Sequence, residues 1–170
     1  MKYLGLGSNL GHKRRNIESA LALISERVGE IRTLSDFYET HPWGYKSKET
    51  YLNIAIAVET ELKPAELLIS TQAIERDTGR KNKTINGEYR DRTIDIDILL
   101  YDDLILQSTT LTIPHPLMHR RTFVLQPLAE IAPHVIHPVL GKSIEELYSI
   151  LLQTTILYQA MTAKAIAGIQ

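Results

Sequence analysis

The feature that most constrains this chain is an alternation of apolar and polar residues over positions 92–100. Successive side chains of a strand point to opposite faces, so the pattern sorts these residues into two sets. The apolar set is Ile94, Ile96, Ile98 and Leu100, and the polar set is Thr93, Asp95 and Asp97. The pattern therefore predicts a strand that buries one face in a core and presents Asp95 and Asp97 side by side on the other.

Asp95 and Asp97 are candidates for a metal site. Side chains two residues apart on a strand are separated by roughly 6.5 Å, so both carboxylates reach the same object. At that distance the two charges repel each other unless a cation sits between them. Mg²⁺ prefers oxygen ligands and carries substrate phosphates with it. The alternative is a solvated strand face whose charges prevent edge-to-edge pairing, and the pattern alone leaves both interpretations open.

The segment from Gly79 to Arg92 favours the metal interpretation. It is basic, rich in turn residues and without apolar periodicity. Its cations are Arg80, Lys81, Lys83, Arg90 and Arg92. By itself such a segment is typical of a solvated loop, but here it leads directly into the aspartate strand. Arginine can bind two phosphate oxygens at once. A basic segment next to two aspartates therefore indicates phosphoryl-type chemistry, in which the protein positions the substrates and neutralises their charge.

Other common ligand motifs are missing or weak. The chain has no P-loop and no protein-kinase signature. Residues 7–11 fail the dinucleotide fingerprint because Leu10 stands where a glycine is needed; this turn either binds an anion or only joins a strand to a helix. His115 and His119 are four residues apart, as in some zinc sites, but Pro116 disfavours a shared helical face and no third ligand is near. A polar loop that contacts a ligand or caps a helix is the favoured interpretation there.

Composition sets the class of protein. A chain of 170 residues with 44% hydrophobic and 23% charged residues is typical of one globular domain, which we expect to span residues 1–170. A net charge of −1 gives no indication of nucleic acid or an anionic membrane as a partner. The absence of cysteine excludes disulfides, thiolate metal sites and a catalytic thiol. No signal peptide or membrane span is predicted, so a cytoplasmic location is expected.

Periodicity and capping residues predict the remaining elements. Predicted strands cover 2–6, 31–40, 52–60 and 111–113; predicted helices cover 13–28, 64–78, 121–131 with a break near Pro127, and 144–153 after a capping box at Ser143–Glu146. The tail from Thr154 is either a further helix or a loosely packed end. Small residues on one face of the strand 52–60 leave room for something flat above the sheet, and Gln72 and Glu75 share one helix face.

Several separated motifs carry a family resemblance. They are Gly7-Ser8-Asn9-Leu10, Phe37-Tyr38-Glu39-Thr40 with Pro42, Tyr51-Leu52-Asn53, Gln72 with Glu75, Gly79-Arg80, Arg92-Thr93-Ile94-Asp95-Ile96-Asp97-Ile98, and Pro114-His115 followed by Arg121 and Phe123. In their order and spacing, over roughly residues 1–150, the chain resembles the 6-hydroxymethyl-7,8-dihydropterin pyrophosphokinases of folate biosynthesis. The resemblance implies a ferredoxin-like α+β fold, an antiparallel sheet with helices packed on one side.

The resemblance also implies an activity and a set of site residues. The implied enzyme transfers diphosphate from ATP to the hydroxymethyl group of 6-hydroxymethyl-7,8-dihydropterin and releases AMP. We expect it to act as a monomer. Asp95 and Asp97 would bind two Mg²⁺, and Arg80 and Arg92 would be catalytic. The implied pterin site is Gly7, Thr40, Pro42, Trp43, Tyr51, Asn53 and Phe123. In it Tyr51 and Phe123 would stack on the pterin ring, and the Asn53 amide would form hydrogen bonds with its edge. Ordinary core packing is the alternative for the aromatic residues. The implied ATP site is Gln72, Glu75, Arg80, Lys83, Arg92, Ile98, Thr112, His115 and Arg121.

The chain departs from the family pattern near the catalytic arginine. Tyr89-Arg90-Asp91 stands where many relatives have Trp-Gly-Pro, and the loop before it is longer, so Lys83 or Arg90 is a candidate for a further phosphate-binding cation. Three other functions share some of these features. An RNA-recognition module needs exposed aromatic residues on its central strands, a nucleotide-binding regulator needs no aspartate pair, and a metal-dependent nuclease would release nucleotides from nucleic acid.

Overall fold

The structure, a computed structural model, describes residues 1–41, 50–79 and 93–167 of the chain. Its strands are β1 (Lys2–Ser8), β2 (Glu30–Leu34), β3 (Tyr38–Thr40), β4 (Tyr51–Glu59), β5 (Asp95–Tyr101), β6 (Leu106–Gln107) and β7 (Thr112–Ile113). Its helices are α1 (Lys13–Arg27), α2 (Pro64–Asp77), the 3₁₀ turn η1 (Met118–Arg120), α3 (Thr122–Ile131) and α4 (Ile144–Ala167).

The main sheet is antiparallel throughout. Its strands run in the order β2-β4-β1-β5, and β3 pairs with the part of β4 that β2 leaves free. β6 and β7 form a separate hairpin. This arrangement of helices and antiparallel strands confirms the predicted α+β class.

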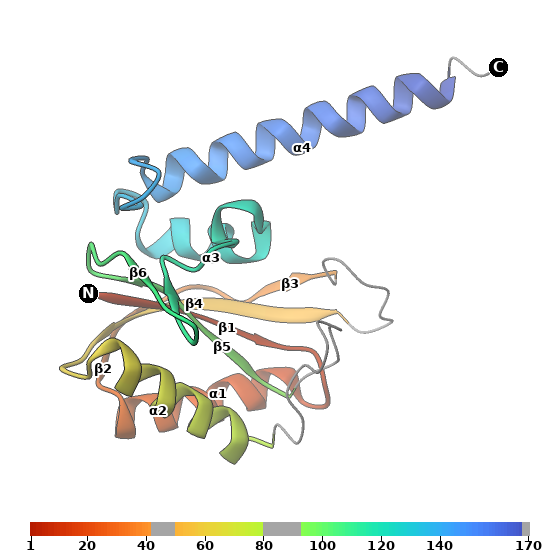
Figure 1. Ribbon diagram of the computed structural model, residues 1–170. Coiled ribbons are helices and arrows are strands. Elements are labelled where there is room, and N and C mark those ends of the chain that lie inside the picture. Colours follow the sequence, from red (N-terminus) through yellow and green to blue (C-terminus); the bar gives the residue numbers. More distant parts are fainter. Residues whose placement is uncertain (42–49, 80–92, 168–170) are drawn as a thin grey trace.

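Helices cover both faces of the sheet. Figure 1 shows α1 and α2 on one side and α3 on the other, with α4 beyond α3. The prediction that the helices pack on one side is therefore wrong. The physical reason is a second apolar surface on the sheet, formed by Ala55, Leu99 and Leu100, which packs with residues of η1, α3 and α4.

The aspartate strand forms as predicted over most of its length. Ile94, Ile96 and Ile98 lie in the core beneath α1 and α2, and Asp95 and Asp97 alternate with them. Leu100 was predicted on this face as well, but it belongs to the second core. The register between β1 and β5 shifts at this point, which places two consecutive residues, Leu99 and Leu100, in the same core.

The predicted strand over 31–40 is divided into β2 and β3. Ser35 still pairs with β4, because its N–H donates to the carbonyl of Ala55 at 3.0 Å and its hydroxyl accepts from the Ala55 N–H at 2.9 Å. The next N–H, that of Asp36, donates instead to the carboxylate of Glu130 on α3, at 3.0 and 3.1 Å. A side chain from the covering helix therefore replaces the strand ladder between β2 and β3.

Two helices differ from their predicted extents. α3 runs through Pro127 without the predicted break. The proline removes one intrahelical hydrogen bond, and the packing of Val124, Leu125 and Leu128 in the second core keeps the helix continuous. α4 begins at the predicted capping box, where the Ser143 N–H donates to Glu146 at 2.7 Å and the Glu146 N–H donates to Ser143 at 3.1 Å. It then continues past residue 153 to Ala167, since the next glycine is Gly168.

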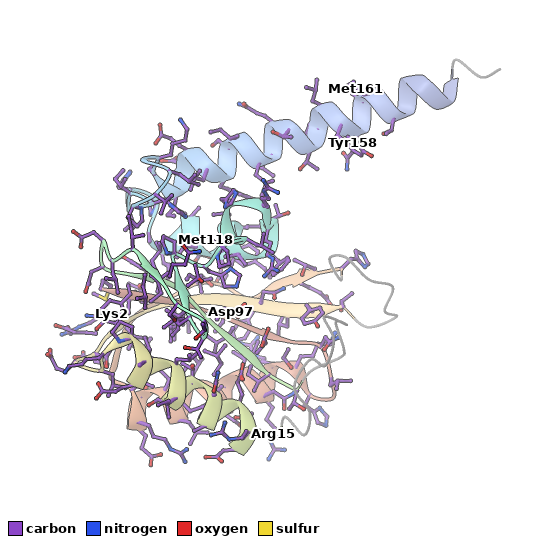
Figure 2. The ribbon with its side chains drawn as sticks, in the orientation of Figure 1. Lys2, Arg15, Asp97, Met118, Tyr158 and Met161 are labelled. Carbon is purple, nitrogen blue, oxygen red and sulfur yellow. The ribbon has the colours of Figure 1, made fainter. Side chains whose placement is uncertain are left out.

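The end of α4 stands away from the rest of the described chain. Figure 2 shows Tyr158 and Met161 on this projecting part, and their exposed fractions are 69% and 63%. None of the helices in the described part of the chain is long and apolar enough to cross a membrane.

Candidate active site

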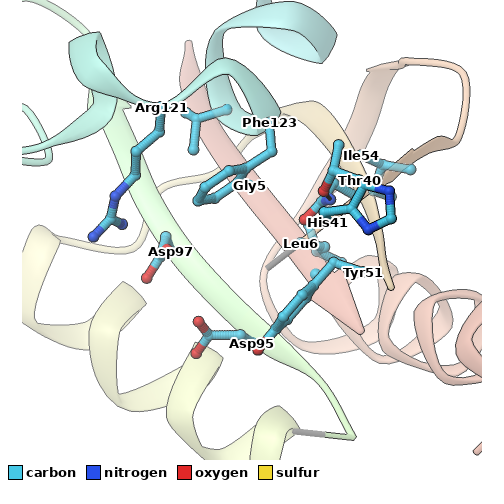
Figure 3. A pocket seen from close by; sticks show the side chains of 13 residues that line it. Gly5, Leu6, Thr40, His41, Tyr51, Ile54, Asp95, Asp97, Arg121 and Phe123 are labelled. Atoms are coloured by element: carbon cyan, nitrogen blue, oxygen red, sulfur yellow. Dashed lines mark hydrogen bonds between the residues drawn. The ribbon is translucent and has the colours of Figure 1, made fainter. Parts of the chain in front are cut away.

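A pocket opens between the sheet and α3, on the face of the sheet opposite α1 and α2. It is lined by Gly5, Leu6, Gly7, Thr40, His41, Tyr51, Asn53, Ile54, Asp95, Asp97, Arg121, Phe123 and Val124. Figure 3 shows the two carboxylates along one side of this pocket and the aromatic rings of Tyr51 and Phe123 reaching in from other elements. The pocket therefore combines residues of β1, β3, β4, β5 and α3. The acidic side chains come from β5, the aromatic ones from β4 and α3, and the cationic Arg121 immediately precedes α3.

Two glycines create the space around the acidic pair. In the register between β1 and β5, Gly5 lies opposite Asp97 and Gly7 lies opposite Asp95. Cross-strand partners point to the same face of a sheet, so larger residues at the glycine positions would place side chains beside the carboxylates. Both aspartates are partly exposed to solvent, which leaves them accessible to a ligand in the pocket.

The polar end of the pocket is fixed by Asn53 and Thr40. Asn53 is only 5% exposed, and its Nδ2 donates to Thr40 Oγ1 at 2.7 Å. A Cβ at Gly7 would lie 3.0 Å from Asn53 Oδ1, so a larger residue there would crowd the amide. The amide is therefore held by its neighbours in one orientation at the pocket wall.

Arg121 and His115 supply hydrogen-bond donors next to the acidic pair. Arg121, immediately before α3, is 6% exposed, and its guanidinium lies 5.8 Å from the centre of the Phe123 ring. Burial and the nearby Arg121 charge lower the pKa of His115 to about 4, against an opposing effect of Asp95. His115 Nδ1 accepts from the Leu117 N–H at 3.3 Å. A neutral imidazole with this partner carries its proton on Nε2, so it can donate a hydrogen bond without carrying a charge.

Several residues predicted to surround ATP lie outside the pocket. Glu75 on α2 is buried, and its Oε1 accepts from the Ile96 N–H at 2.8 Å. The Ile98 side chain is in the core, so only its backbone is available to a ligand. Gln72 is half-buried on α2, and Thr112 pairs with Gln107 in the β6–β7 hairpin. Their roles toward a nucleotide stay predictions.

Some predicted site residues lie outside the described part of the chain. They are Pro42, Trp43, Arg80, Lys83 and Arg92, together with the departure from the family pattern at Tyr89–Asp91. The structure therefore gives no position for the two predicted catalytic arginines.

The sequence analysis also missed residues that line the pocket. They are Gly5, Leu6, His41, Ile54 and Val124. Gly5 could have been found, because it lies on the predicted strand 2–6 two residues before Gly7, and residues two apart on an extended chain share a face. No comparable signal marks the other four.

The acidic pair fits a metal that needs few protein ligands. Within the residues that the structure describes, no group of three or more histidine, aspartate or glutamate side chains is placed to hold an ion. Mg²⁺ is commonly held by one or two carboxylates while water and substrate phosphates complete its coordination, so Asp95 and Asp97 fit this ion. His119 does not form the considered zinc site with His115; its ring lies edge-on to that of His137, with 6.4 Å between the ring centres.

Comparison with known proteins identifies relatives along most of the chain. The family model described as 7,8-dihydro-6-hydroxymethylpterin-pyrophosphokinase (HPPK) matches residues 3–133. The 2-amino-4-hydroxy-6-hydroxymethyldihydropteridine pyrophosphokinase of Porphyromonas gingivalis is 50% identical over 137 residues, which are 80% of this chain and 92% of that protein. The protein of the same name from Aquifex aeolicus is 40% identical over 144 residues, 85% of this chain and 88% of the relative.

Solved structures share the fold. A crystal structure of HPPK-DHPS in complex with substrates matches with a TM-score of 0.71 at 16% identity, over 91% of this chain and 44% of that chain. HPPK-DHPS of Plasmodium falciparum, a triple mutant solved with STZ-DHP, matches with the same TM-score at 18% identity and covers 87% of this chain. This chain thus spans less than half the length of those proteins, and at such identities the likeness concerns the fold.

Proposed function

The chain belongs to the 7,8-dihydro-6-hydroxymethylpterin-pyrophosphokinase family, and we propose that its pocket transfers diphosphate from ATP to the hydroxymethyl group of 6-hydroxymethyl-7,8-dihydropterin. The reaction releases AMP and belongs to folate biosynthesis. One observation carries the proposal: Asp95 and Asp97 line the same pocket as Tyr51 and Phe123. A site suited to a polyphosphate with its metal and a site suited to a flat aromatic ring therefore adjoin each other.

The pterin would occupy the part of the pocket between the aromatic rings. A flat bicyclic ring gains most from aromatic faces on either side and from a few fixed polar groups at its edge. Tyr51 and Phe123 provide the faces, and the Asn53 amide, held by Thr40, provides the edge. Binding in this position would direct the hydroxymethyl group toward the acidic side of the pocket.

Asp95 and Asp97 would hold the Mg²⁺ that accompanies ATP. Bound Mg²⁺ neutralises phosphate charge and polarises the phosphoryl group under attack. The protein's own donors complete the phosphate site: Arg121 offers a buried guanidinium, and neutral His115 offers its Nε2–H. Arg80 and Arg92 would add further positive charge as the catalytic arginines.

The substrate hydroxyl is the nucleophile, so the chemistry requires no nucleophilic side chain. Its oxygen attacks the β-phosphorus of ATP, the bond from that phosphorus to the α,β-bridging oxygen breaks, and AMP leaves. The hydroxyl proton passes to solvent or to a phosphate oxygen. In such transfers positioning and charge stabilisation account for most of the rate enhancement. We further propose that the enzyme acts in the cytoplasm as a monomer.

Product analysis tests the proposed reaction. The chain is incubated with ATP, Mg²⁺ and the hydroxymethyl-dihydropterin, and nucleotides and pterins are separated by chromatography. We expect AMP and the pterin diphosphate in equal amounts, and no AMP when the pterin is left out. Formation of ADP, or turnover that does not depend on the pterin, would refute the proposal. Release of nucleotides from added DNA or RNA would favour the nuclease instead.

A further inference from the structure

Three side chains from separate parts of the chain meet next to the pocket residues Thr40 and Tyr51: Lys13 of α1, Glu39 of β3, and Thr50, which precedes β4. Lys13, the first residue of α1, donates from its Nζ to the carbonyl oxygen of Thr50 at 2.9 Å and to Thr50 Oγ1 at 2.8 Å. The same ammonium lies 3.7 Å from Glu39 Oε1, and the Thr50 hydroxyl donates to that carboxylate oxygen. We call Lys13, Glu39 and Thr50 the clasp.

The clasp is adjacent in sequence to two residues of the proposed pterin site. Glu39 immediately precedes Thr40, and Thr50 immediately precedes Tyr51; Thr40 and Tyr51 are themselves cross-strand partners and line the pocket. A side chain of α1 is therefore bonded to the chain on both sides of this pair. The clasp has no atom in the lining of the pocket, so any effect on a ligand must pass through Thr40 and Tyr51.

The antiparallel pair of β3 and β4, here called the hairpin, gains from such an attachment. β3 is a three-residue edge strand that pairs with β4 alone, so few backbone hydrogen bonds hold Thr40 against Tyr51. Lys13 is well suited to hold it, because its side chain is only 22% exposed and makes two hydrogen bonds to Thr50. The Thr50 hydroxyl and, after it, the charge of Lys13 lower the pKa of Glu39, so the carboxylate of the clasp is ionised at neutral pH.

We propose that Lys13 is a positioning residue for the pterin. By binding Thr50 and Glu39 it holds Tyr51 and Thr40 in the orientation that receives the flat ring. This inference rests on the proposed function, since it assigns the clasp to the substrate of that reaction. It assigns the clasp no part in holding ATP, because Asp95, Asp97 and Arg121 come from β5 and the start of α3.

Lys13→Met tests the proposal, because it keeps most of the side-chain length and removes the charge and the donors. We expect the KM for the pterin to rise roughly 3- to 10-fold, as for the loss of one or two hydrogen bonds that fix a binding residue. The KM for ATP and kcat should stay within twofold of the wild type. Thr50→Val removes both hydrogen bonds of the Thr50 hydroxyl without changing α1, but it keeps the bond from Lys13 Nζ to the Thr50 carbonyl oxygen. It should therefore show the same selective effect to a smaller extent. Arg15→Met, an exposed change on the same helical turn, is the matched control and should behave as the wild type.

A ligand-free measurement separates the clasp from the reaction. Hydrogen exchange at the backbone amides of residues 38–40 and 51–53 should be faster in Lys13→Met and Thr50→Val and unchanged in Arg15→Met. Unchanged exchange, an unchanged pterin KM, or equal rises in both KM values would each overturn the role of Lys13. Absence of turnover in the wild type would instead refute the proposed function, and the exchange rates would still decide whether Lys13 holds the hairpin.

Discussion

The Glu75 carboxylate on α2 accepts a hydrogen bond of 2.8 Å from the backbone N–H of Ile96, the residue between Asp95 and Asp97. Glu75 is 5% exposed, so this contact is formed in the protein interior. It ties the middle of the acidic pair to a helix on the opposite face of the sheet. The spacing of the two carboxylates is therefore supported from behind the strand that carries them.

Replacing Glu75 should weaken both the fold and the site. In Glu75→Ala the Ile96 N–H loses its buried acceptor, a change that costs about 1–3 kcal/mol. We expect this loss in the free energy of unfolding measured with urea, together with a lower kcat. Glu75→Gln keeps an oxygen acceptor and should stay closer to the wild type on both measures. An alanine variant as stable as the wild type would show that the contact contributes nothing.

A second hydrogen bond to a carboxylate connects β3 and α3, which lie on two sides of the pocket. The Tyr38 hydroxyl on β3 donates to Glu130 Oε2 on α3 at 2.9 Å, and this bond, followed by burial, raises the pKa of Tyr38 to about 12. Tyr38→Phe should lower the free energy of unfolding by about 1 kcal/mol and remove the step near pH 12 from an ultraviolet titration of the tyrosines. Tyr158→Phe, at a residue that is 69% exposed, is the control and should leave stability unchanged. If Tyr38→Phe is as stable as Tyr158→Phe, the hydrogen bond between Tyr38 and Glu130 does not stabilise the fold.

His115 should make the ligand-free protein less stable in acid. Its pKa is lowered from 6.5 to about 4 in the folded protein, mainly by burial, so between these values the unfolded chain binds more protons. His115 therefore leaves the free energy of unfolding unchanged above pH 6.5. As the pH falls from 6.5 toward 4, this free energy decreases by at most about 3 kcal/mol. Urea unfolding across this range without divalent ions should show a steeper loss in the wild type than in His115→Gln. If the free energy of unfolding has the same pH dependence in the wild type and in His115→Gln, His115 is not the group responsible.

The projecting end of α4 should be dispensable for stability. The side chains of residues 153–162 are all exposed, whereas Leu147 and Leu151 pack in the second core. A chain that ends at residue 154 should therefore have the same free energy of unfolding in urea as the full chain, within about 0.5 kcal/mol. It should also aggregate less, because exposed Ile156, Leu157 and Met161 are removed. A loss of 2 kcal/mol or more (roughly the cost of a deleted core contact) would mean that these residues contact the folded body.

Local patterns in the sequence predicted most of the elements. The alternation around Asp95 and Asp97 and the helical spacing of Ile17, Ala20 and Ile24 depend only on neighbouring residues, and both produced the predicted element. The packing of helices on both faces of the sheet was not predictable in the same way. The second apolar face arises where the register of β5 shifts and Leu99 joins Leu100 in one core, and a strict period of two cannot show this.

The candidate site was predictable where the motif residues themselves line it. The two aspartates were predicted from the alternation over residues 92–100, and Tyr51, Asn53 and Phe123 from the family resemblance; the structure places all five around one pocket. Glu75 shows where this reasoning stops. A carboxylate on a helix face can point to a ligand or to a neighbouring strand, and only the packing of α2 against β5 shows that it accepts from Ile96.

The central claim is that Asp95 and Asp97 hold the divalent ions that accompany ATP beside the pterin. It is tested most directly by titrating Mn²⁺, in place of Mg²⁺, into the protein with a non-hydrolysable ATP analogue and the pterin, and counting bound ions by electron paramagnetic resonance. Asp103→Asn, at an exposed aspartate outside the pocket, is the control. We predict two bound ions in the wild type and the control, and loss of at least one in Asp97→Asn at unchanged thermal stability. Full binding of both ions by Asp97→Asn would contradict the account.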